Sequence, residues 1–165
     1  MLDLIKNIFF NNPVSLGYQA NDGGRSAAGF KGLAGDCVVR SIAIVARLSY
    51  GQVYEDLRLA NEVYAKSKDN RVAKRISEKG STPRNGNHRD VFHDYILALG
   101  FKWVPRMAVG KGCQVHLRAD ELPSGRLIVR VSKHLTAVID GVIYDTHNPS
   151  RHGTRCVYGY YIKVA

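Results

Sequence analysis

Apolar residues recur every three or four positions in the first part of the chain, a spacing typical of amphipathic helices. The pattern predicts a first helix over residues 37–47, with Asp36 at its N-cap. Ser49 and Gln52 match a capping box. A second helix should therefore begin there and end near residues 66–69.

The third predicted helix covers residues 88–99, and Gly100 suits its C-cap. Residues 11–36 are rich in Gly, Asn and Ser, and we interpret them as an extended, ordered loop. The pattern then becomes strand-like, at residues 101–104, 114–117, 127–132, 134–140, 141–146 and 156–164. Helices followed by strands indicate an α+β fold, with N-terminal helices packed on a C-terminal antiparallel sheet in one domain over residues 1–165.

One hairpin register can be predicted in detail. Residues 140–141 are Asp-Gly between two β-branched runs, which is a strong signal for a two-residue turn. This turn pairs Val138 with Ile143 in the flanking strands. Because side chains alternate along a strand, His134 and Asp145 then share one face and lie diagonal to each other, within reach of a long side chain.

Cys37 is the candidate nucleophile. It stands at the predicted helix start, where unpaired backbone N–H groups and the helix dipole favour the thiolate. A cysteine hydrolase also needs an imidazole to accept and return a proton, and a carboxylate or amide to orient that imidazole. His134 and Asp145 supply these two groups on the predicted hairpin.

These motifs resemble the papain-like cysteine peptidase superfamily, especially the compact bacterial group that includes the double-glycine leader peptidases. The matching residues are Asp36-Cys37 at a helix start, His134 in the segment 134–141, and Asp145, in that chain order. The stretches 21–25, 35–37 and 136–141 also look like those of short bacterial and phage proteins without established function. The resemblance implies a papain-like fold and a Cys37, His134, Asp145 triad that cleaves a peptide, isopeptide or related amide or thioester bond.

The chain departs from the superfamily at the oxyanion hole. Papain-like enzymes usually place a Gln about six residues before the Cys, but Lys31 occupies that position here. Gln19 and Asn21 are the upstream amides that could replace it, beside the backbone N–H of Cys37.

The remaining cysteines and histidines do not form a recognisable metal motif. Cys37, Cys113 and Cys156 are an odd number without tight spacing, which argues against a disulfide framework and favours a reducing compartment. His147, His152 and Cys156 match no zinc spacing. We therefore expect Cys113 and Cys156 to be structural and the protein to need no metal or organic cofactor.

The formal net charge of +10 predicts attraction to polyanions. Residues 66–90 form a basic, polar segment that we expect to be an exposed excursion from the core; its candidate contacts are Lys66, Lys68, Arg71, Lys74, Arg75 and Lys79. An alternative function is therefore a non-enzymatic binding protein of the same fold that holds nucleic acid or an acidic protein.

Neither a signal peptide nor a membrane span is expected from the sequence. Residues 1–10 are apolar, but the stretch is short, is interrupted by Asp3 and Lys6, and lacks a cleavage site. The expectation is a cytoplasmic protein with a protein or peptide substrate and no membrane partner.

Overall fold

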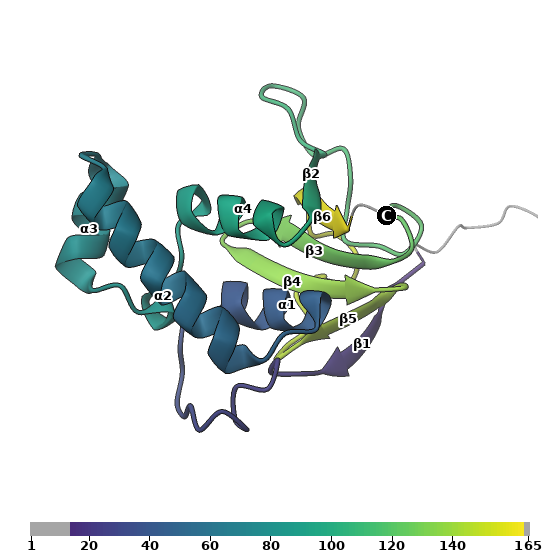
Figure 1. Cartoon of the computed structure of the whole chain (residues 1–165). Helices are drawn as coiled ribbons and strands as arrows, with labels where there is room; N and C mark the ends of the chain where they lie inside the picture. Colours follow the sequence, from purple (N-terminus) through teal and green to yellow (C-terminus); the bar gives the residue numbers. More distant parts are fainter. Residues whose placement is uncertain (1–13, 164–165) are drawn as a thin grey trace, which may run out of the picture.

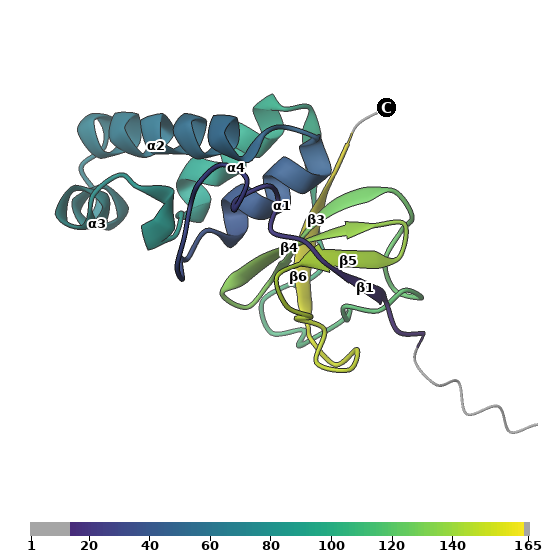
Figure 2. The same cartoon turned by 90° about the horizontal axis from the view of Figure 1, so that it is seen from below.

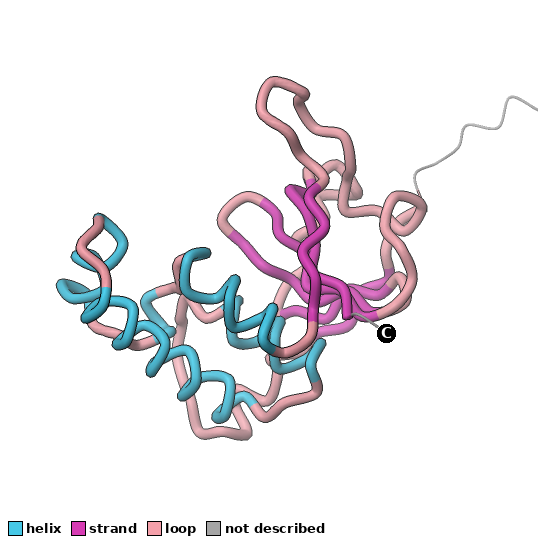
Figure 3. The backbone as a smooth tube through the Cα atoms, turned by 45° about the horizontal axis from the view of Figure 1, so that its top comes forward, coloured by secondary structure: helices cyan, strands magenta, loops and turns pink. Residues whose placement is uncertain are grey.

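The computed structural model describes residues 14–163, and within them the fold is α+β. The helices are α1 (Cys37–Ala46), α2 (Tyr50–Ser67), α3 (Arg71–Lys79), η1 (Pro83–Asn85, a 3-10 turn) and α4 (Arg89–Ala98). The strands are β1 (Gly17–Ala20), β2 (Phe101–Pro105), β3 (Arg126–Val131), β4 (His134–Ile139), β5 (Val142–Asp145) and β6 (Val157–Lys163). The helices gather on one side of the molecule and the strands on the other (Figure 1, Figure 3).

The strands form one mixed sheet in the order β1-β5-β4-β3-β6-β2. β1 runs parallel to β5, whereas the other neighbours are antiparallel. The expectation of a purely antiparallel, C-terminal sheet was therefore wrong. Residues 17–20, expected to be loop, add a parallel edge strand because they pair with a strand about 125 positions later in the chain.

The predicted hairpin register is confirmed. Val138 pairs with Ile143 and Ile139 with Val142 across the β4–β5 turn. Asp140 and Gly141 at this turn have φ angles of 46° and 80°. Positive φ at both central residues is the geometry of a type I′ turn, which Asp-Gly adopts readily.

Helices α1 and α4 lie on one face of the sheet, and α2 packs on these two helices (Figure 1, Figure 2). Their core residues pack on Phe101, Ile128, Leu135, Ala137 and Tyr161. A second core lies on the other face, where Leu16 and Leu117 cover alternate residues of the same strands. Because both faces of the sheet are closely packed, its strands have little room to move. The sheet is therefore a rigid support for the residues at its edge.

The predicted start of α2 is confirmed. The Ser49 hydroxyl accepts the Gln52 N–H at 3.2 Å and begins α2. Arg47 adopts a left-handed conformation after α1. Arg126 of β3 donates to the carbonyls of Ile44 and Val45, so the last turn of α1 is tied to the sheet.

The basic segment 66–90, expected to be an exposed excursion from the core, contains the helix α3 and the turn η1. Asn70 caps α3 by accepting the Ala73 N–H at 2.9 Å, and this helix buries Ala73 and Ile76. α3 packs against α2 on the side away from the sheet (Figure 2). With two buried residues in α3, the hydrophobic pattern of this helix is too weak to be recognised in a sequence dominated by charged residues.

The 114–117 strand is absent, and only one isolated bridge, between His116 and Cys156, forms there. Cys113 and Cys156, expected to be structural, form a disulfide, so the argument against disulfides from the number and spacing of the cysteines was wrong for these two residues. The bond ties the long β2–β3 connection to the start of β6. Cys37 is the free cysteine of the described chain.

Among the helices within residues 14–163, none has the length and apolar character needed to cross a bilayer. The apolar segment 1–10 lies outside the described residues.

Candidate active site

Cys37 is the first residue of α1, as the sequence predicts, but Asp36 plays a different part from the expected cap. Its side chain makes no capping hydrogen bond. The carboxylate is instead fully buried, where it pairs with Arg25 at 2.7 Å and Arg40 at 2.5 Å, and accepts the Tyr50 hydroxyl at 2.6 Å. Because no N-cap side chain occupies them, the first-turn N–H groups of α1 can interact with negative charge beside Cys37.

His134 and Asp145 meet as the hairpin register predicts. Nε2 of His134 lies 2.7 Å from Oδ2 of Asp145. Both side chains are largely buried, with exposed fractions of 13% and 4%. The other oxygen of Asp145 accepts the Thr146 N–H at 2.7 Å, which fixes the carboxylate. Since Nε2 faces Asp145, Nδ1 is the ring nitrogen left for Cys37.

The thiol and the imidazole influence each other's ionisation. Burial opposes ionisation of Cys37, but a hydrogen bond to His134 and the positive charge of its ring lower the pKa of the thiol below its usual value. Burial also disfavours charged His134, yet hydrogen bonds to Asp145 and Cys37 raise the pKa of the imidazole to about 9. Both shifts act in the direction of a thiolate beside an imidazolium.

The pKa of Asp145 is also shifted. Burial acts to raise it, but the hydrogen bond and the charge of His134 outweigh burial and hold it below the ordinary value. Asp145 is consequently ionised at neutral pH, where His134 carries its proton.

The loop before α1 forms one wall of the site. Asp22 organises a tight turn by accepting the N–H groups of Gly24 and Ser26 and the Ser26 hydroxyl. Gly23 lies against the backbone of Arg40, where a Cβ would be 3.0 Å from the Arg40 Cα, and its φ is +68°. This position favours glycine both by space and by conformation.

A cavity of about 790 Å³ lies beside Cys37 and His134. Its walls come from the loop before α1, the start of α4, the β3–β4 turn and the residues after β5. The basic residues and histidines of its lining, apart from His134, are Arg25, Arg40, His88, Arg89, Arg130, Lys133 and His147. Asp22 is the acidic lining residue, and Arg25 and Arg40 are paired with the buried Asp36, so the excess positive charge of the cavity comes from Arg89, Arg130 and Lys133.

Gln19 and Asn21, the expected oxyanion donors, do not line this cavity. β1 runs parallel to β5, which places Gln19 opposite Tyr144 with an exposed side chain. The side-chain oxygen of Asn21 accepts the Gly23 N–H at 2.8 Å, and Asn21 lines a separate cavity beside Arg126 and Tyr144. The parallel pairing therefore directs both amides away from Cys37.

Asn87 is a cavity-lining residue that sequence reasoning missed. Asn61 donates to the Ser81 carbonyl at 2.9 Å and to Oδ1 of Asn87 at 3.2 Å, which turns the Asn87 amide nitrogen away from Asn61. That nitrogen is buried and has no hydrogen-bond partner among the described residues. Gly35 donates to the Arg84 carbonyl at 2.9 Å, so the segment of Asn87 lies alongside the residues that precede Cys37.

Nothing local marks Asn87 as functional. Its neighbours, Asn85 and Gly86, give the segment the composition of an ordinary turn. Only the long-range contact between residues 35 and 84 reveals its position.

Ligand atoms of His134, Asp145 and His147 lie within 4.8 Å of one another and could hold a metal ion. The His134 and Asp145 atoms, however, already form a close hydrogen bond, and His147 is exposed. The alternative set of His147, His152 and Cys156 cannot bind through Cys156, because its sulfur is in the disulfide. A bound ion would therefore compete with the proton shared by His134 and Asp145.

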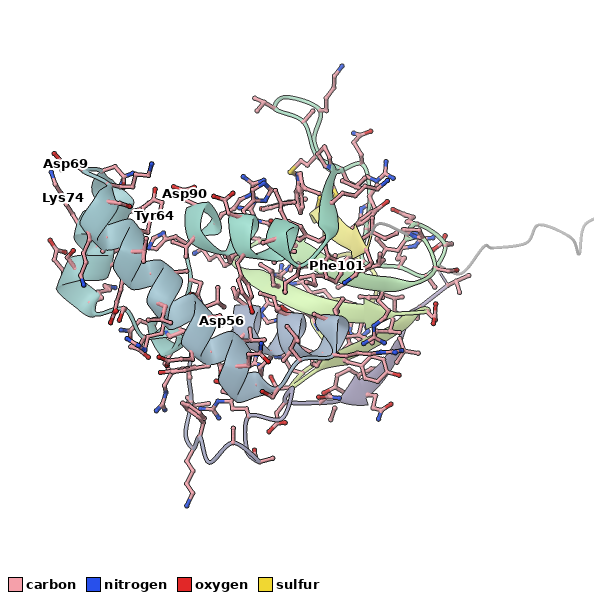
Figure 4. The ribbon with its side chains drawn as sticks, in the orientation of Figure 1. Asp56, Tyr64, Asp69, Lys74, Asp90 and Phe101 are labelled. Carbon is pink, nitrogen blue, oxygen red and sulfur yellow. A yellow bond between two sulfur atoms is a disulfide. The ribbon has the colours of Figure 1, made fainter. Side chains whose placement is uncertain are left out.

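The basic candidate contacts are remote from Cys37. Lys66 and Lys68 are exposed at the end of α2, and Arg71, Lys74, Arg75 and Lys79 line a shallow cavity on α3 together with Glu78. Figure 4 shows Lys74 and its ion-pair partner Asp69 at the far end of the helical layer, beyond Tyr64 and Asp90.

Comparison with protein-family models, with curated proteins and with solved structures finds no match. The papain-like resemblance of the motifs therefore remains a hypothesis.

Proposed function

We propose that the chain is a cysteine hydrolase in which Cys37 is the nucleophile, His134 the general base and acid, and Asp145 the group that orients His134. The observation that carries this proposal is the position of His134. One ring nitrogen lies 2.7 Å from a buried carboxylate, and the imidazole interacts with a thiol whose pKa is lowered. A histidine with a purely structural role requires neither a buried carboxylate nor a thiol beside its ring. A cysteine that only fills space in the core is not stabilised by an adjacent cation.

The reaction would begin with attack of the Cys37 thiolate on a carbonyl carbon, which forms the C–S bond and a tetrahedral oxyanion. The imidazolium of His134 then gives its proton to the leaving amine as the C–N bond breaks, leaving a thioester. Water attacks the thioester while His134 accepts its proton. Collapse releases the carboxylic acid and regenerates the thiolate beside the imidazolium. These steps use water alone as co-reactant.

The oxyanion would be stabilised by the backbone N–H of Cys37 and the side-chain amide of Asn87. The first belongs to the uncapped first turn of α1. The second is a buried donor without a partner among the described residues, and it lines the same cavity as Cys37. Hydrogen-bond donors held ready in a partly dehydrated site stabilise developing negative charge more than water does.

The test is alkylation by iodoacetamide near pH 6, followed by mass spectrometry of the modified residue. We expect Cys37 to react much faster than a free cysteine, which is almost wholly protonated at this pH. His134→Ala should remove the advantage, while His152→Ala, at an exposed turn residue, should keep it. Reaction at the rate of free cysteine, unchanged in His134→Ala, would contradict the proposal.

A second candidate function rests on the exposed basic residues of α3. The cluster of Arg71, Lys74, Arg75 and Lys79 contains one acidic neighbour in its cavity, Glu78. Such a surface would bind a polyanion with an affinity that falls steeply with salt. Charge reversal at Lys74 and Arg75 should reduce the slope of affinity against salt concentration; absence of binding to nucleic acid at low salt would exclude this ligand.

A further inference from the structure

A second cavity, of about 530 Å³, adjoins the cavity at Cys37, and both are lined by Arg89 and Arg130. The other walls of the second cavity come from β2, from the segment after it and from the start of β6. They include Trp103, Pro105, Met107, Val109 and Tyr158. The shared arginines join the two cavities into one trough, which leads from Cys37 toward the segment after β2. The backbone of that segment projects from the molecule (Figure 1, Figure 3).

Arg89 and Arg130 converge in this trough from different elements. Arg89 is the first residue of α4, and its guanidinium lies 5.3 Å from the Trp103 ring centroid. Arg130, in β3, lies 5.6 Å from the ring centroid of Tyr158. Burial raises the pKa of Tyr161 to about 12, and the positive charges of Arg89 and Arg130 both oppose this rise. Both guanidinium groups are therefore close enough to influence the same hydroxyl.

The two positive charges lack a neutralising partner in the described chain. Within residues 14–163, no carboxylate forms an ion pair with either Arg89 or Arg130. Nε of Arg89 is buried and makes no hydrogen bond there. Asp94 acts on this region only through its charge. Two neighbouring guanidinium groups repel each other, and a planar carboxylate placed between them would relieve the repulsion and accept their N–H groups.

The rim of the trough is apolar. Leu33 lines the Cys37 cavity and Val109 the second cavity, and both side chains are fully exposed. Met107 is also exposed beside Val109. Exposed apolar side chains that flank a cavity are typical of a surface that contacts a partner. The occupant should therefore carry an acidic group next to apolar ones.

We infer that the trough binds an extended polypeptide, with an Asp or Glu side chain held between Arg89 and Arg130 and an apolar side chain against Trp103 and Met107. This inference rests on the proposed function, because the trough is the approach to Cys37. A peptide is favoured over nucleic acid because attack by a thiolate needs an acyl carbon, which a nucleic-acid backbone lacks.

Binding can be measured apart from cleavage by using the Cys37→Ala protein. Fluorescence anisotropy would follow pairs of labelled peptides that differ only by Glu or Gln beside an apolar residue. We expect the Glu peptide to bind about tenfold to a hundredfold more tightly. Arg130→Gln and Arg89→Gln should remove this preference. Lys102→Gln, which neutralises an exposed cation outside the trough, should preserve it.

Arg130→Glu provides a second variant. It should bind a peptide with Lys at the test position more tightly than the peptide with Glu. Equal affinity for Glu and Gln peptides, or a preference for a single-stranded oligonucleotide that competes for the same site, would overturn the inference. Cleavage of peptides by the wild-type protein without any preference for acidic residues would overturn it while leaving the proposed function intact. Selective binding by Cys37→Ala with no cleavage by the wild type would support the trough and contradict the hydrolase.

Discussion

Arg40 contacts two buried carboxylates at once: one terminal nitrogen lies 2.5 Å from Oδ1 of Asp36, and the other lies 3.6 Å from Oδ1 of Asp145. Asp36 directly precedes Cys37, and Asp145 bonds to His134. Arg40 thus joins the helix of the nucleophile to the strand that orients the base. It is a positioning residue, since its link to the sulfur runs through other groups.

Replacing Arg40 by Met should destabilise the protein by about 3 kcal/mol, because buried carboxylates lose a cation. Arg40→Lys should recover part of this stability but not the two-sided contact, so Cys37 alkylation near pH 6 should remain slow. Urea unfolding and the alkylation rate are the measurements. Arg58→Met, which breaks partly exposed pairs with Glu55 and Glu62, should cost much less stability. Equal losses at the two positions would contradict the role of Arg40.

Alkylation and hydrolysis should differ in their dependence on pH. Alkylation needs only the thiolate, so its rate should rise through the lowered pKa of Cys37 and then stay high. Hydrolysis also needs protonated His134 and should fall as the pH rises through about 9, the pKa of that imidazole. Parallel profiles for the two reactions would contradict this assignment.

In Asp145→Asn, the rate of hydrolysis should begin to decrease at a lower pH on the alkaline side of its profile, because Asp145 is one of the groups that raise the pKa of His134. The rate of peptide hydrolysis measured from pH 5 to pH 10 would show the shift. Asp69→Asn, at a 91% exposed side chain remote from the site, is the control and should leave the profile unchanged. An unchanged profile in Asp145→Asn as well would remove Asp145 from its proposed role.

Asn87→Ala should lower kcat for hydrolysis by about 10² to 10³, the usual loss when one oxyanion donor is removed. Alkylation of Cys37 should keep its rate, because displacement at the carbon of iodoacetamide passes through no oxyanion. Asn85→Ala, two residues earlier and exposed, serves as the matched control. If both reactions slow equally in Asn87→Ala, the residue supports the structure of the site and not the oxyanion.

The disulfide closes a loop of 43 residues, and loop-closure entropy assigns such a bond up to about 4 kcal/mol. In the Cys37→Ala protein, unfolding without reductant should reveal no free thiol, and reduction should reveal two. Cys113→Ser with Cys156→Ser should lower the stability toward urea accordingly. Two reactive thiols in the unreduced protein would show that the bond does not form.

Local signals explain which features could be predicted from the sequence. Asp140 and Gly141 determine the hairpin register, and Ser49 marks the start of α2. β1 escaped prediction because it is four residues long, exposed throughout, and held by a partner far along the chain. Asn87 and the Cys113–Cys156 pair acquire their positions through distant contacts, which no local pattern encodes. The same holds for the contact of Arg40 with Asp145, although its pair with Asp36 is local.

The order of the site residues along the chain has a consequence for synthesis. Cys37 leaves the ribosome nearly a hundred residues before His134, and β1 must wait still longer for its partner β5. Until the hairpin emerges, the thiol has no imidazole to ionise it and Asp145 is not yet present. The nascent chain therefore carries an ordinary cysteine, and the proposed hydrolase becomes chemically competent only after the β4–β5 hairpin has been synthesised.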